Sequence, residues 1–365
     1  MKRLLCILSG MNAGGAETFL MKIYRNLDRT EYQMDFCINV PEKCYYEDEI
    51  LSLGGRVYRI PAKSVSLRGF KKQLYEVIKA NGYYHVLRIT SSGAGFMDLK
   101  IAQRAGAGIR AARSSNSSDG GSLKSEILHR LGRILYGRYV NVRIAPSDLA
   151  ARYTFGRRMY EKGFVNVLHN GIDISERGYD AEGRRKIRSE LHISDDVRVI
   201  GHVGRFMTQK NHGFLLEIFS RYVKENENSM LLLVGGGELE TQIRKQAETL
   251  GILDRIVFAG VRSDVPALLS AMDVFVFPSL YEGMPNAVIE AQATGLPCII
   301  SDTVTREADI TGLVSYLPLG DAAAWADCIA QLPVTLRTTP KKQFVANGYD
   351  IDSVTEQFIG SIFGE

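Results

Sequence analysis

Cysteine is scarce in this sequence: five cysteines are scattered along 365 residues, and no two of them are spaced as CxxC. An odd number of separated cysteines gives neither a disulfide framework nor a thiolate metal site, and it is typical of a reducing compartment. Long apolar runs are also missing, since none approaches the roughly 20 residues that span a bilayer. The run that begins at Leu4 is short and leads into a glycine-rich turn, which favours a first β-strand over a signal peptide. We therefore expect a cytoplasmic protein.

Two common nucleotide-binding signatures are absent from the turn that follows this first run. Residues 10–17, with adjacent glycines at Gly14 and Gly15, lack the GxGxxG spacing of a dinucleotide site and the Gly-Lys-Ser/Thr of a P-loop. Adjacent glycines before a helix still let backbone amides approach a phosphate. From the residues alone, a phosphate-binding turn and a plain tight turn are equally good interpretations.

The net charge of +4 is small, but it conceals an unequal distribution. Residues 1–170 hold 27 lysines and arginines against 14 acidic residues, a balance of +13, whereas residues 171–365 hold 18 against 27, a balance of −9. A basic half is expected to face an anionic partner, such as a membrane surface, a phosphorylated substrate or a nucleic acid. Nucleic acid is the least favoured, because the sequence shows neither a recognised nucleic-acid motif nor an aromatic stacking platform.

The segment 123–136 has the pattern of a basic amphipathic helix. Its apolar residues are predicted on one helical face and its basic residues mainly away from it: Leu123, Ile127, Leu131, Ile134 and Leu135 against Lys124, Arg130, Arg133 and Arg138. Such a helix can lie on an anionic membrane. A core-facing helix with a solvated basic face is an equally good interpretation, and the basic first half favours peripheral contact with the inner face of the plasma membrane.

Short apolar runs alternate with amphipathic stretches along the chain, and the alternation restarts after a polar stretch at 175–188. This pattern predicts an α/β protein with two parallel-sheet domains, helices on both faces of each sheet, and a boundary near 170–195. The expected strands are 3–9, 34–40, 56–60, 84–90, 109–114, 141–146, 164–168, 197–203, 230–235, 255–259, 273–278 and 297–301. The expected helices include 18–27, 70–80, 213–225, 239–250, 266–271 and 286–293.

The segment 278–291 carries the most functional information. It follows the predicted buried strand 273–278 and enters the predicted helix 286–293. Glu282 then lies in the loop at the carboxyl end of a strand and Glu290 on the helix that follows, which is the edge where open α/β sheets bind ligands. Backbone amides that are free to bind a ligand are expected here at Gly283, Met284 and Asn286. Taken alone, Glu282 is better interpreted as a solvated loop residue.

Three further turns at predicted strand ends carry glycine or charge. Arg205 and Lys210 follow the strand 197–203, and an arginine fork with a mobile ammonium suits a diphosphate. Cations fixed beside a nucleoside diphosphate also stabilise the charge that it gains as a leaving group. Gly235–Gly237 and residues 260–265 form the equivalent turns in the next two units. Each turn alone has a plain structural explanation, but their repetition at one end of the sheet favours a binding site.

Together, these motifs resemble the nucleotide-sugar domain of the retaining, GT-B-fold glycosyltransferases of the "glycosyl transferases group 1" type, especially bacterial enzymes of exopolysaccharide, capsule or lipopolysaccharide synthesis. The resemblance is carried by Gly204–Lys210, Gly235–Gly237, Phe258–Val265, the Glu-x7-Glu motif from Glu282 to Glu290, Gly14 with Gly15, and the hinge Asn170–Asp173. It implies two Rossmann-like domains facing each other across a cleft. Residues 1–170 with 350–365 would bind the acceptor and residues 171–349 the donor, and a helix at 352–363 would cross back to the first domain.

The resemblance also implies roles for individual residues. Arg205 and Lys210 would neutralise the donor diphosphate, Glu290 would accept hydrogen bonds from the ribose hydroxyls, and Glu282 would hold hydroxyls of the donor sugar. Further donor contacts are implied at Gly204, Gly235, Val261 (beside the nucleobase), Gly283, Met284, Pro285 and Asn286, with Gly14 and Gly15 closing over the phosphates.

The implied reaction is a front-face displacement with retention, in which the leaving phosphate oxygen helps to deprotonate the acceptor hydroxyl. It uses a nucleotide-sugar co-substrate, expected to be UDP-linked, with no separate cofactor and no metal. Asp350 and Asp352 look like the metal-binding Asp-x-Asp of other transferases, but they lie near the C-terminus and are interpreted as a helix cap. The expected partners are the nucleotide-sugar donor and a glycan or lipid-linked acceptor.

One departure from the family pattern lies in the first domain. The most similar subgroup has histidines after the strand that corresponds to 109–113, one of which contacts the donor sugar. This chain has Arg113, Ser115 and Asn116 there and no histidine. The change is compatible with altered sugar specificity, with a serine hydroxyl taking over the contact, or with reduced activity. A catalytically weakened relative that binds a nucleotide sugar or glycan is therefore the alternative hypothesis.

Overall fold

The computed structural model describes residues 1–12, 14–90, 95–115, 123–282, 284–333 and 337–364, with the backbone alone at 123–128, 130 and 131. The chain forms two compact units, one of Met1–Gly171 with Gly348–Glu365 and the other of Ile172–Asn347. The chain passes from one unit to the other at 171/172 and at 347/348. The limits drawn from the sequence are 170/171 and 349/350, which lie within two residues of these points.

The first unit is built on a parallel sheet with the strand order β3-β2-β1-β4-β5-β6-β7. Its strands are β1 (Lys2–Ile7), β2 (Tyr32–Ile38), β3 (Val57–Arg59), β4 (His85–Thr90), β5 (Ile109–Ser114), β6 (Val142–Ala145) and β7 (Asn166–Val167). Its helices are α1 (Gly15–Asn26), α2 (Glu47–Ser52), α3 (Leu67–Ala80), α4 (Phe96–Arg104), α5 (Leu123–Tyr139), α6 (Asp148–Phe155), α7 (Arg157–Glu161) and α16 (Ile351–Phe363).

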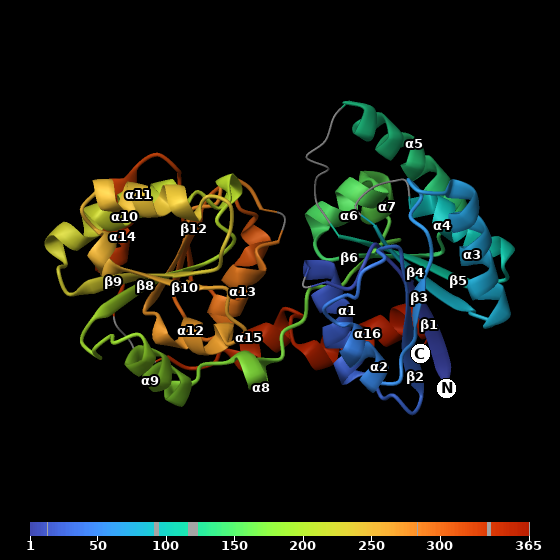
Figure 1. The fold of residues 1–365 in the computed structure, drawn as a ribbon, viewed down its shortest axis with the longest axis horizontal. Helices are drawn as coiled ribbons and strands as arrows, with labels where there is room; N and C mark the ends of the chain where they lie inside the picture. The colour runs from blue at the N-terminus through green and yellow to red at the C-terminus, as the bar shows by residue number, and fades with distance from the viewer. Residues whose placement is uncertain (13, 91–94, 116–122, 283, 334–336, 365) are drawn as a thin grey trace. The chain divides into compact units, whose positions relative to one another are not determined.

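Helices cover both faces of this sheet, as Figure 1 shows. One face buries apolar side chains of α1, α2 and α16, and the other buries those of α3, α4, α5 and α6. Phe358 of the C-terminal helix packs edge-on against Phe19 of α1, with ring centroids 6.3 Å apart. The side chain of Asp350 accepts the amide of Ser353 at 3.3 Å. The predicted C-terminal helix of the first domain and its aspartate cap are therefore confirmed.

The second unit has a parallel sheet of order β10-β9-β8-β11-β12-β13. Its strands are β8 (Arg198–Val203), β9 (Ser229–Val234), β10 (Ile256–Gly260), β11 (Val274–Phe277), β12 (Cys298–Ser301) and β13 (Val314–Leu317). Its helices are α8 (Ile174–Arg177), α9 (Ala181–Glu190), α10 (His212–Glu225), α11 (Glu240–Thr249), α12 (Val265–Ala271), α13 (Asn286–Ala293), α14 (Ala322–Gln331) and α15 (Lys341–Ala346).

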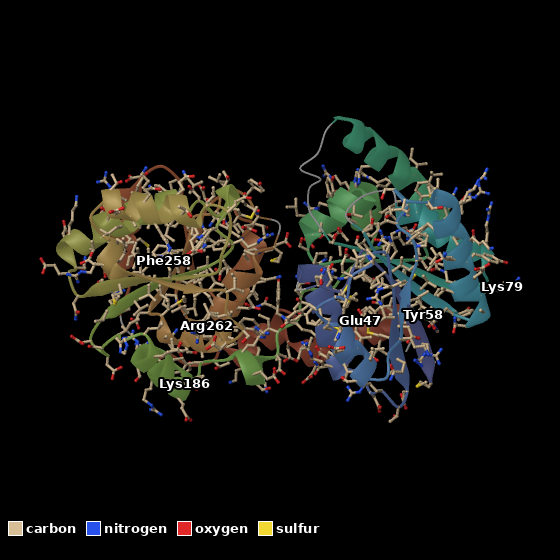
Figure 2. The ribbon with its side chains drawn as sticks, in the orientation of Figure 1. Glu47, Tyr58, Lys79, Lys186, Phe258 and Arg262 are labelled. Carbon is tan, nitrogen blue, oxygen red and sulfur yellow. The ribbon has the colours of Figure 1, made fainter. Side chains whose placement is uncertain are left out.

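This sheet is also covered on both faces. Side chains of α10, α11 and α14 form the core on one face, and those of α9, α12 and α13 form the core on the other. Figure 2 shows how densely side chains fill the space between helices and strands in each unit. The prediction of two parallel-sheet domains with helices on both faces is confirmed. The sequence pattern did not predict β13 or the helices α8, α9, α14 and α15.

The helix predicted at 123–136 forms as α5, and two residues of its predicted apolar face are exposed instead of facing the core. Ile134 is 76% exposed and Leu135 37% exposed, although the pattern places both on the apolar face. Tyr136 is buried instead: its ring packs against Phe155 at 5.9 Å, and its hydroxyl donates to Thr90 Oγ1 at 3.2 Å. A tyrosine can bury its ring when a partner binds the hydroxyl, and apolar periodicity does not register this. The side chains of Leu123, Ile127 and Leu131 lie outside the described residues.

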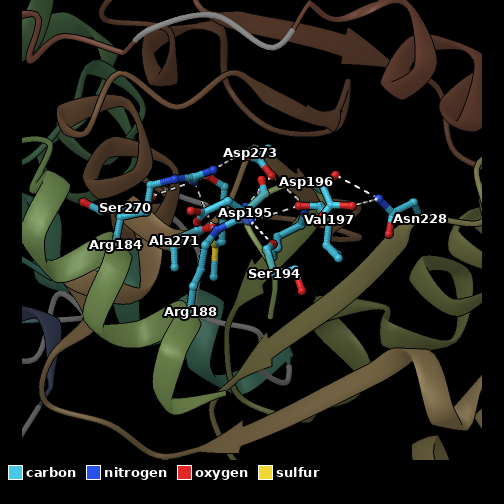
Figure 3. Close-up of polar contacts among 12 residues, drawn as sticks. Arg184, Arg188, Ser194, Asp195, Asp196, Val197, Asn228, Ser270, Ala271 and Asp273 are labelled. Carbon is cyan, nitrogen blue, oxygen red and sulfur yellow. Dashed lines mark hydrogen bonds and ion pairs between the residues drawn. The ribbon is translucent and has the colours of Figure 1, made fainter. Parts of the chain in front are cut away.

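Two arginines one turn apart on α9 hold the start of β11, as Figure 3 shows. Arg184 and Arg188 contact the two carboxylate oxygens of Asp273 at 2.8 and 2.7 Å, and the amide of Val199 donates to the same carboxylate at 2.8 Å. These guanidinium groups also donate to carbonyls at the C-terminal end of α12, at Ser270, Ala271 and Met272. Cations at this end satisfy unpaired carbonyls and complement the helix dipole. Arg188 is 1% exposed, so its charge depends on Asp273.

Replacing Asp273 with asparagine is expected to lower the free energy of unfolding of the second unit by about 2–4 kcal/mol, because the buried Arg188 loses its counter-charge. Urea denaturation measures the change. Asp327→Asn on the exposed side of α14 is the control, with an expected change below about 0.5 kcal/mol. Equal unfolding midpoints for the two variants would show that the arginine cluster does not hold the strand.

Candidate functional site

The second sheet reverses its strand order at its centre. The neighbouring strands β8 and β11 are the point from which the chain proceeds outward in opposite directions. Loops that follow two such strands diverge, and ligands bind at the edge between their carboxyl ends. Arg205 and Lys210 follow β8 and Glu282 follows β11, so the three predicted catalytic residues lie at this edge.

Lys210 and Glu282 form an ion pair across this edge. Lys210 Nζ lies 2.6 Å from Glu282 Oε1, and the two side chains are only 17% and 10% exposed. The same ammonium lies 4.6 Å from the centroid of the Phe277 ring, at the end of β11. A cation and a carboxylate that are largely removed from water depend on each other, because either one left alone is costly. The pair therefore fixes both charges in one place.

The two loops are also joined next to this ion pair. The side-chain amide of Gln209 donates to the carbonyl of Tyr281 at 2.8 Å, and the amide of Leu280 donates to the carbonyl of Gln209 at 2.9 Å. These contacts flank Lys210 and Glu282 in the sequence. They restrict the movement of one loop against the other and hold the predicted diphosphate and sugar residues as one unit.

Arg205 differs from Lys210 in its surroundings. Its side chain is exposed, and within the described part of the chain no carboxylate forms an ion pair with it. A guanidinium group in this state can receive an external anion in the bidentate geometry that suits carboxylates and phosphates. The loop after β8 thus presents one partly buried, paired cation and one exposed cation.

The glycines of this edge have a structural role that can be assigned. Gly235 has φ +136°, and a Cβ built on it would lie 2.1 Å from the carbonyl oxygen of Gly204. A Cβ on Gly237 would lie 2.6 Å from the carbonyl oxygen of Phe206. The backbones of the two loops therefore touch, and only glycine permits this approach. The close approach of the two backbones therefore accounts for glycine at Gly235 and Gly237 without reference to a ligand.

Val261 lies at the end of β10 and is 85% exposed, although it is apolar. It approaches Gly236 of the neighbouring loop, where a Cβ would meet Val261 Cγ2 at 3.3 Å. The next residue, Arg262, which Figure 2 labels, is bound to Asp264 at 2.6 Å and to Glu190 at 2.6 Å. The loop is thus held by its arginine while its valine faces outward, and Arg262 is already engaged by two carboxylates.

Glu290 lies on α13 and contacts Arg177 of α8, with Arg177 Nη1 3.3 Å from Glu290 Oε1. Arg177 was not predicted as a site residue, because nothing in its local pattern relates it to a carboxylate 113 residues away. At the start of α13, Met284 is half-buried, Pro285 is the buried N-cap and Asn286 is exposed in the first turn. Gly283 lies outside the described residues.

Two buried histidines beside Lys210 were also missed. His202 and His212 are 0% and 2% exposed, and their ring centroids lie 4.7 Å apart. His202 Nδ1 donates to the carbonyl of Val276 at 2.8 Å, while its Nε2 and both nitrogens of His212 have no hydrogen-bond partner among the described residues. Burial, together with the Lys210 charge, lowers the pKa of His202 well below its ordinary value and that of His212 to about 4. Both rings are therefore neutral at pH 7.

The remaining predicted residues belong to the first unit. Gly14 is the N-cap of α1 and Gly15 is its first residue. Arg113 is 1% exposed: its guanidinium donates to Asn170 Oδ1 at 2.7 Å and lies 3.7 Å from the centroid of the Phe19 ring. Burial lowers the pKa of Arg113 to about 9. Ser115 is partly exposed, and its amide donates to the carbonyl of Thr90 at 2.9 Å.

Asn116 lies outside the described residues. Within those described, no three histidine, cysteine, aspartate or glutamate residues are grouped so that they could hold a metal ion. Likewise, no described helix has the length and apolar character required to cross a membrane.

Comparison with known proteins gives consistent matches. A model of the family described as "Glycosyl transferases group 1" matches residues 197–333. The chain is similar to the putative glycosyltransferase EpsF of Bacillus subtilis (strain 168), with 36% identity over 372 aligned positions that cover 99% of this chain and 95% of that protein.

Two further matches concern part of the chain and its fold. The UDP-Gal:alpha-D-GlcNAc-diphosphoundecaprenol alpha-1,3-galactosyltransferase of Escherichia coli is 38% identical over 143 residues, which cover 38% of this chain and 36% of that enzyme. The crystal structure of Alr3699/HepE of Anabaena in complex with UDP and glucose matches with a TM-score of 0.76, at 17% identity and 100% coverage of both chains. At this identity the structural likeness concerns the fold.

The two buried histidines predict how stability depends on pH. Their folded-state pKa values lie below the ordinary value of 6.5, so the unfolded chain binds protons that the folded chain does not. The part of the free energy of unfolding that depends on these neutral histidines is therefore fully present above pH 6.5 and is lost as the pH falls toward 4. For His212 alone the loss by pH 4 is expected to be about 3 kcal/mol.

Urea denaturation of the wild type and of His212→Leu between pH 7 and pH 4 measures this loss. The variant should show a shallower decline, because leucine carries no group that protonates. A decline of the same slope in both proteins would mean that His212 does not titrate as described.

Proposed function

The chain belongs to the glycosyl transferases group 1 family, and we propose that it is a retaining glycosyltransferase that moves a sugar from a nucleoside-diphosphate donor, a UDP-sugar, to a glycan or lipid-linked acceptor. Its two Rossmann-like domains have the GT-B fold. The observation that carries the proposal is the set of charges at the switch point of the second sheet: the exposed Arg205 and the Lys210–Glu282 pair.

The diphosphate is assigned to the loop after β8. Arg205 is free to bind phosphate oxygens, and Lys210 holds a second positive charge beside them. As the bond between the sugar and the diphosphate breaks, negative charge develops on the leaving oxygen. Cations that are already fixed in place stabilise this charge without further reorganisation. The partly buried ion pair supplies such a fixed cation.

The sugar and the nucleoside are assigned to the neighbouring residues. Glu282 is placed to accept hydrogen bonds from sugar hydroxyls, Glu290 to accept those of the ribose, and the exposed Val261 to contact the base. UDP is favoured because a fold relative was solved with UDP and glucose, and because a sequence relative is named as a UDP-Gal transferase. Glu282 is bound to Lys210, so sugar and phosphate are recognised by two ends of one ion pair.

The proposed reaction is a front-face displacement that needs no metal. The bond from the anomeric carbon to the phosphate oxygen breaks while the acceptor oxygen bonds to the same face of that carbon. The acceptor proton passes to the leaving phosphate oxygen, so the products are the glycoside and a nucleoside diphosphate. Positioning and charge stabilisation carry this reaction, and no side-chain base is required.

The acceptor is proposed to be a saccharide of a surface polysaccharide, carried on a lipid. The EpsF relative is named only as a putative glycosyltransferase, but the E. coli relative is named for a diphosphoundecaprenol acceptor. The exposed Ile134 and Leu135 on α5, together with the +13 balance of residues 1–170, support peripheral contact with an anionic membrane. Cytoplasmic location at the inner membrane face remains part of this proposal.

Hydrolysis of a panel of nucleotide sugars tests the proposal. The wild type is expected to release the nucleoside diphosphate from a UDP-sugar, and Lys210→Ala and Glu282→Ala to reduce kcat/KM by about 100-fold or more. Lys245→Ala, an exposed lysine on α11, is the control and should retain wild-type turnover.

The same assay distinguishes an active transferase from the alternative, a catalytically weakened relative that binds a nucleotide sugar or glycan. Binding of a nucleotide sugar without turnover of any donor, even with lipid-linked acceptors present, would favour a catalytically weakened relative, as the absent first-domain histidine suggests. Failure to bind any nucleotide sugar would contradict both.

A further inference from the structure

We infer that Arg177 is a positioning residue for Glu290, which it orients toward the ribose hydroxyls of the donor; the inference rests on the proposed nucleotide-sugar function. Arg177 lies on α8, a helix of four residues directly after the point where the chain enters the second unit. The orientation of Glu290 toward the ribose would then depend on α8, at the start of the second unit, as well as on α13.

The contact has the geometry that this role requires. Arg177 Nη1 lies 3.3 Å from Glu290 Oε1, and the side chains are 29% and 21% exposed. Within the described residues, Arg177 is the only hydrogen-bond or ion-pair partner of the Glu290 carboxylate. One oxygen is thus engaged while the other remains available. A carboxylate that must accept from two neighbouring hydroxyls gains affinity when its orientation is fixed in advance.

The short helix that carries Arg177 is itself held firmly at its start. The carboxylate of Asp173 accepts the amides of Ser175 at 3.0 Å and Glu176 at 3.3 Å, which is a helix N-cap. The amide of Arg177 donates to the carbonyl of Asp173 at 2.9 Å and closes the turn. Without such a cap, four residues would not form a stable helical turn.

The helices α8 and α13 both lie against the segment 338–339. After α8, the amide of Tyr179 donates to Thr339 Oγ1 at 2.9 Å. After α13, Gly295 approaches the same segment so closely that a Cβ would lie 2.4 Å from the carbonyl oxygen of Thr338. Residues 338–339 therefore fix the ends of the helices that carry Arg177 and Glu290, and the distance between the two side chains is set by the fold.

A plain surface ion pair is the competing explanation. Exposed pairs contribute about 0–1 kcal/mol to stability, and removing one would leave ligand affinity unchanged. The two explanations differ in ribose recognition, because only a positioning residue acts through Glu290 on the hydroxyls. A ligand without those hydroxyls separates them.

Calorimetric titration with UDP and with 2′,3′-dideoxy-UDP tests the inference on the full chain. Arg177→Gln is expected to weaken UDP binding about three- to tenfold, the range of the net contribution of a typical hydrogen bond, and to leave dideoxy-UDP binding within about twofold. Arg177→Lys should restore part of the UDP affinity. In a Glu290→Gln background, Arg177→Gln should add no further loss. Arg244→Gln, which removes an exposed arginine paired with Glu240 on α11, is the matched control and should alter neither affinity.

Equal loss of affinity for both nucleotides in Arg177→Gln, a gain in UDP affinity, or additive losses with Glu290→Gln would overturn the inference and leave the proposed function standing. A wild-type chain that binds neither nucleotide would overturn the proposed function, and this inference with it.

Discussion

The ion pair between Lys210 and Glu282 is the interaction on which the rest of the site depends. It joins the ends of β8 and β11, where the second sheet reverses its strand order, and it holds two opposite charges largely away from water. Neither charge is stable there without the other. The proposed diphosphate and sugar contacts are thus not independent of each other. A ligand that engages Lys210 also changes the surroundings of Glu282, so binding of phosphate and of sugar should be coupled.

Ion pairs hold the chain on both sides of the short strand β11. β11 has four residues; Asp273 precedes it and is held by Arg184 and Arg188, and Glu282 follows it and is held by Lys210. The loops around the site are brought into contact by glycines whose backbones touch, as at Gly235. Under this arrangement lie two neutral histidines. Rigid surroundings of this kind would keep the proposed catalytic groups in place before a substrate binds.

Much of this architecture could be predicted from the sequence, because strand ends in a parallel sheet lie at one edge. Glu282 and Lys210 carry a signal of this kind, since each follows an apolar run. Arg177 carries none: its partner is 113 residues away, and only the tertiary fold brings them together. His202 lies inside a strand pattern, where a polar residue gives no indication of its partner. The apolar pattern of α5 did not indicate that Tyr136 would be buried while Ile134 is exposed, because it does not register a ring whose hydroxyl has a hydrogen-bond partner. β13 was missed because it is short and only partly buried.

A crystal structure of the chain with a bound UDP-sugar would test whether the ends of β8 and β11 form the donor site. We expect diphosphate oxygens within hydrogen-bond distance of both Arg205 and Lys210, a sugar hydroxyl on Glu282 and the ribose hydroxyls on Glu290. A nucleotide bound away from the carboxyl ends of β8 and β11, or a diphosphate that contacts neither cation, would contradict it.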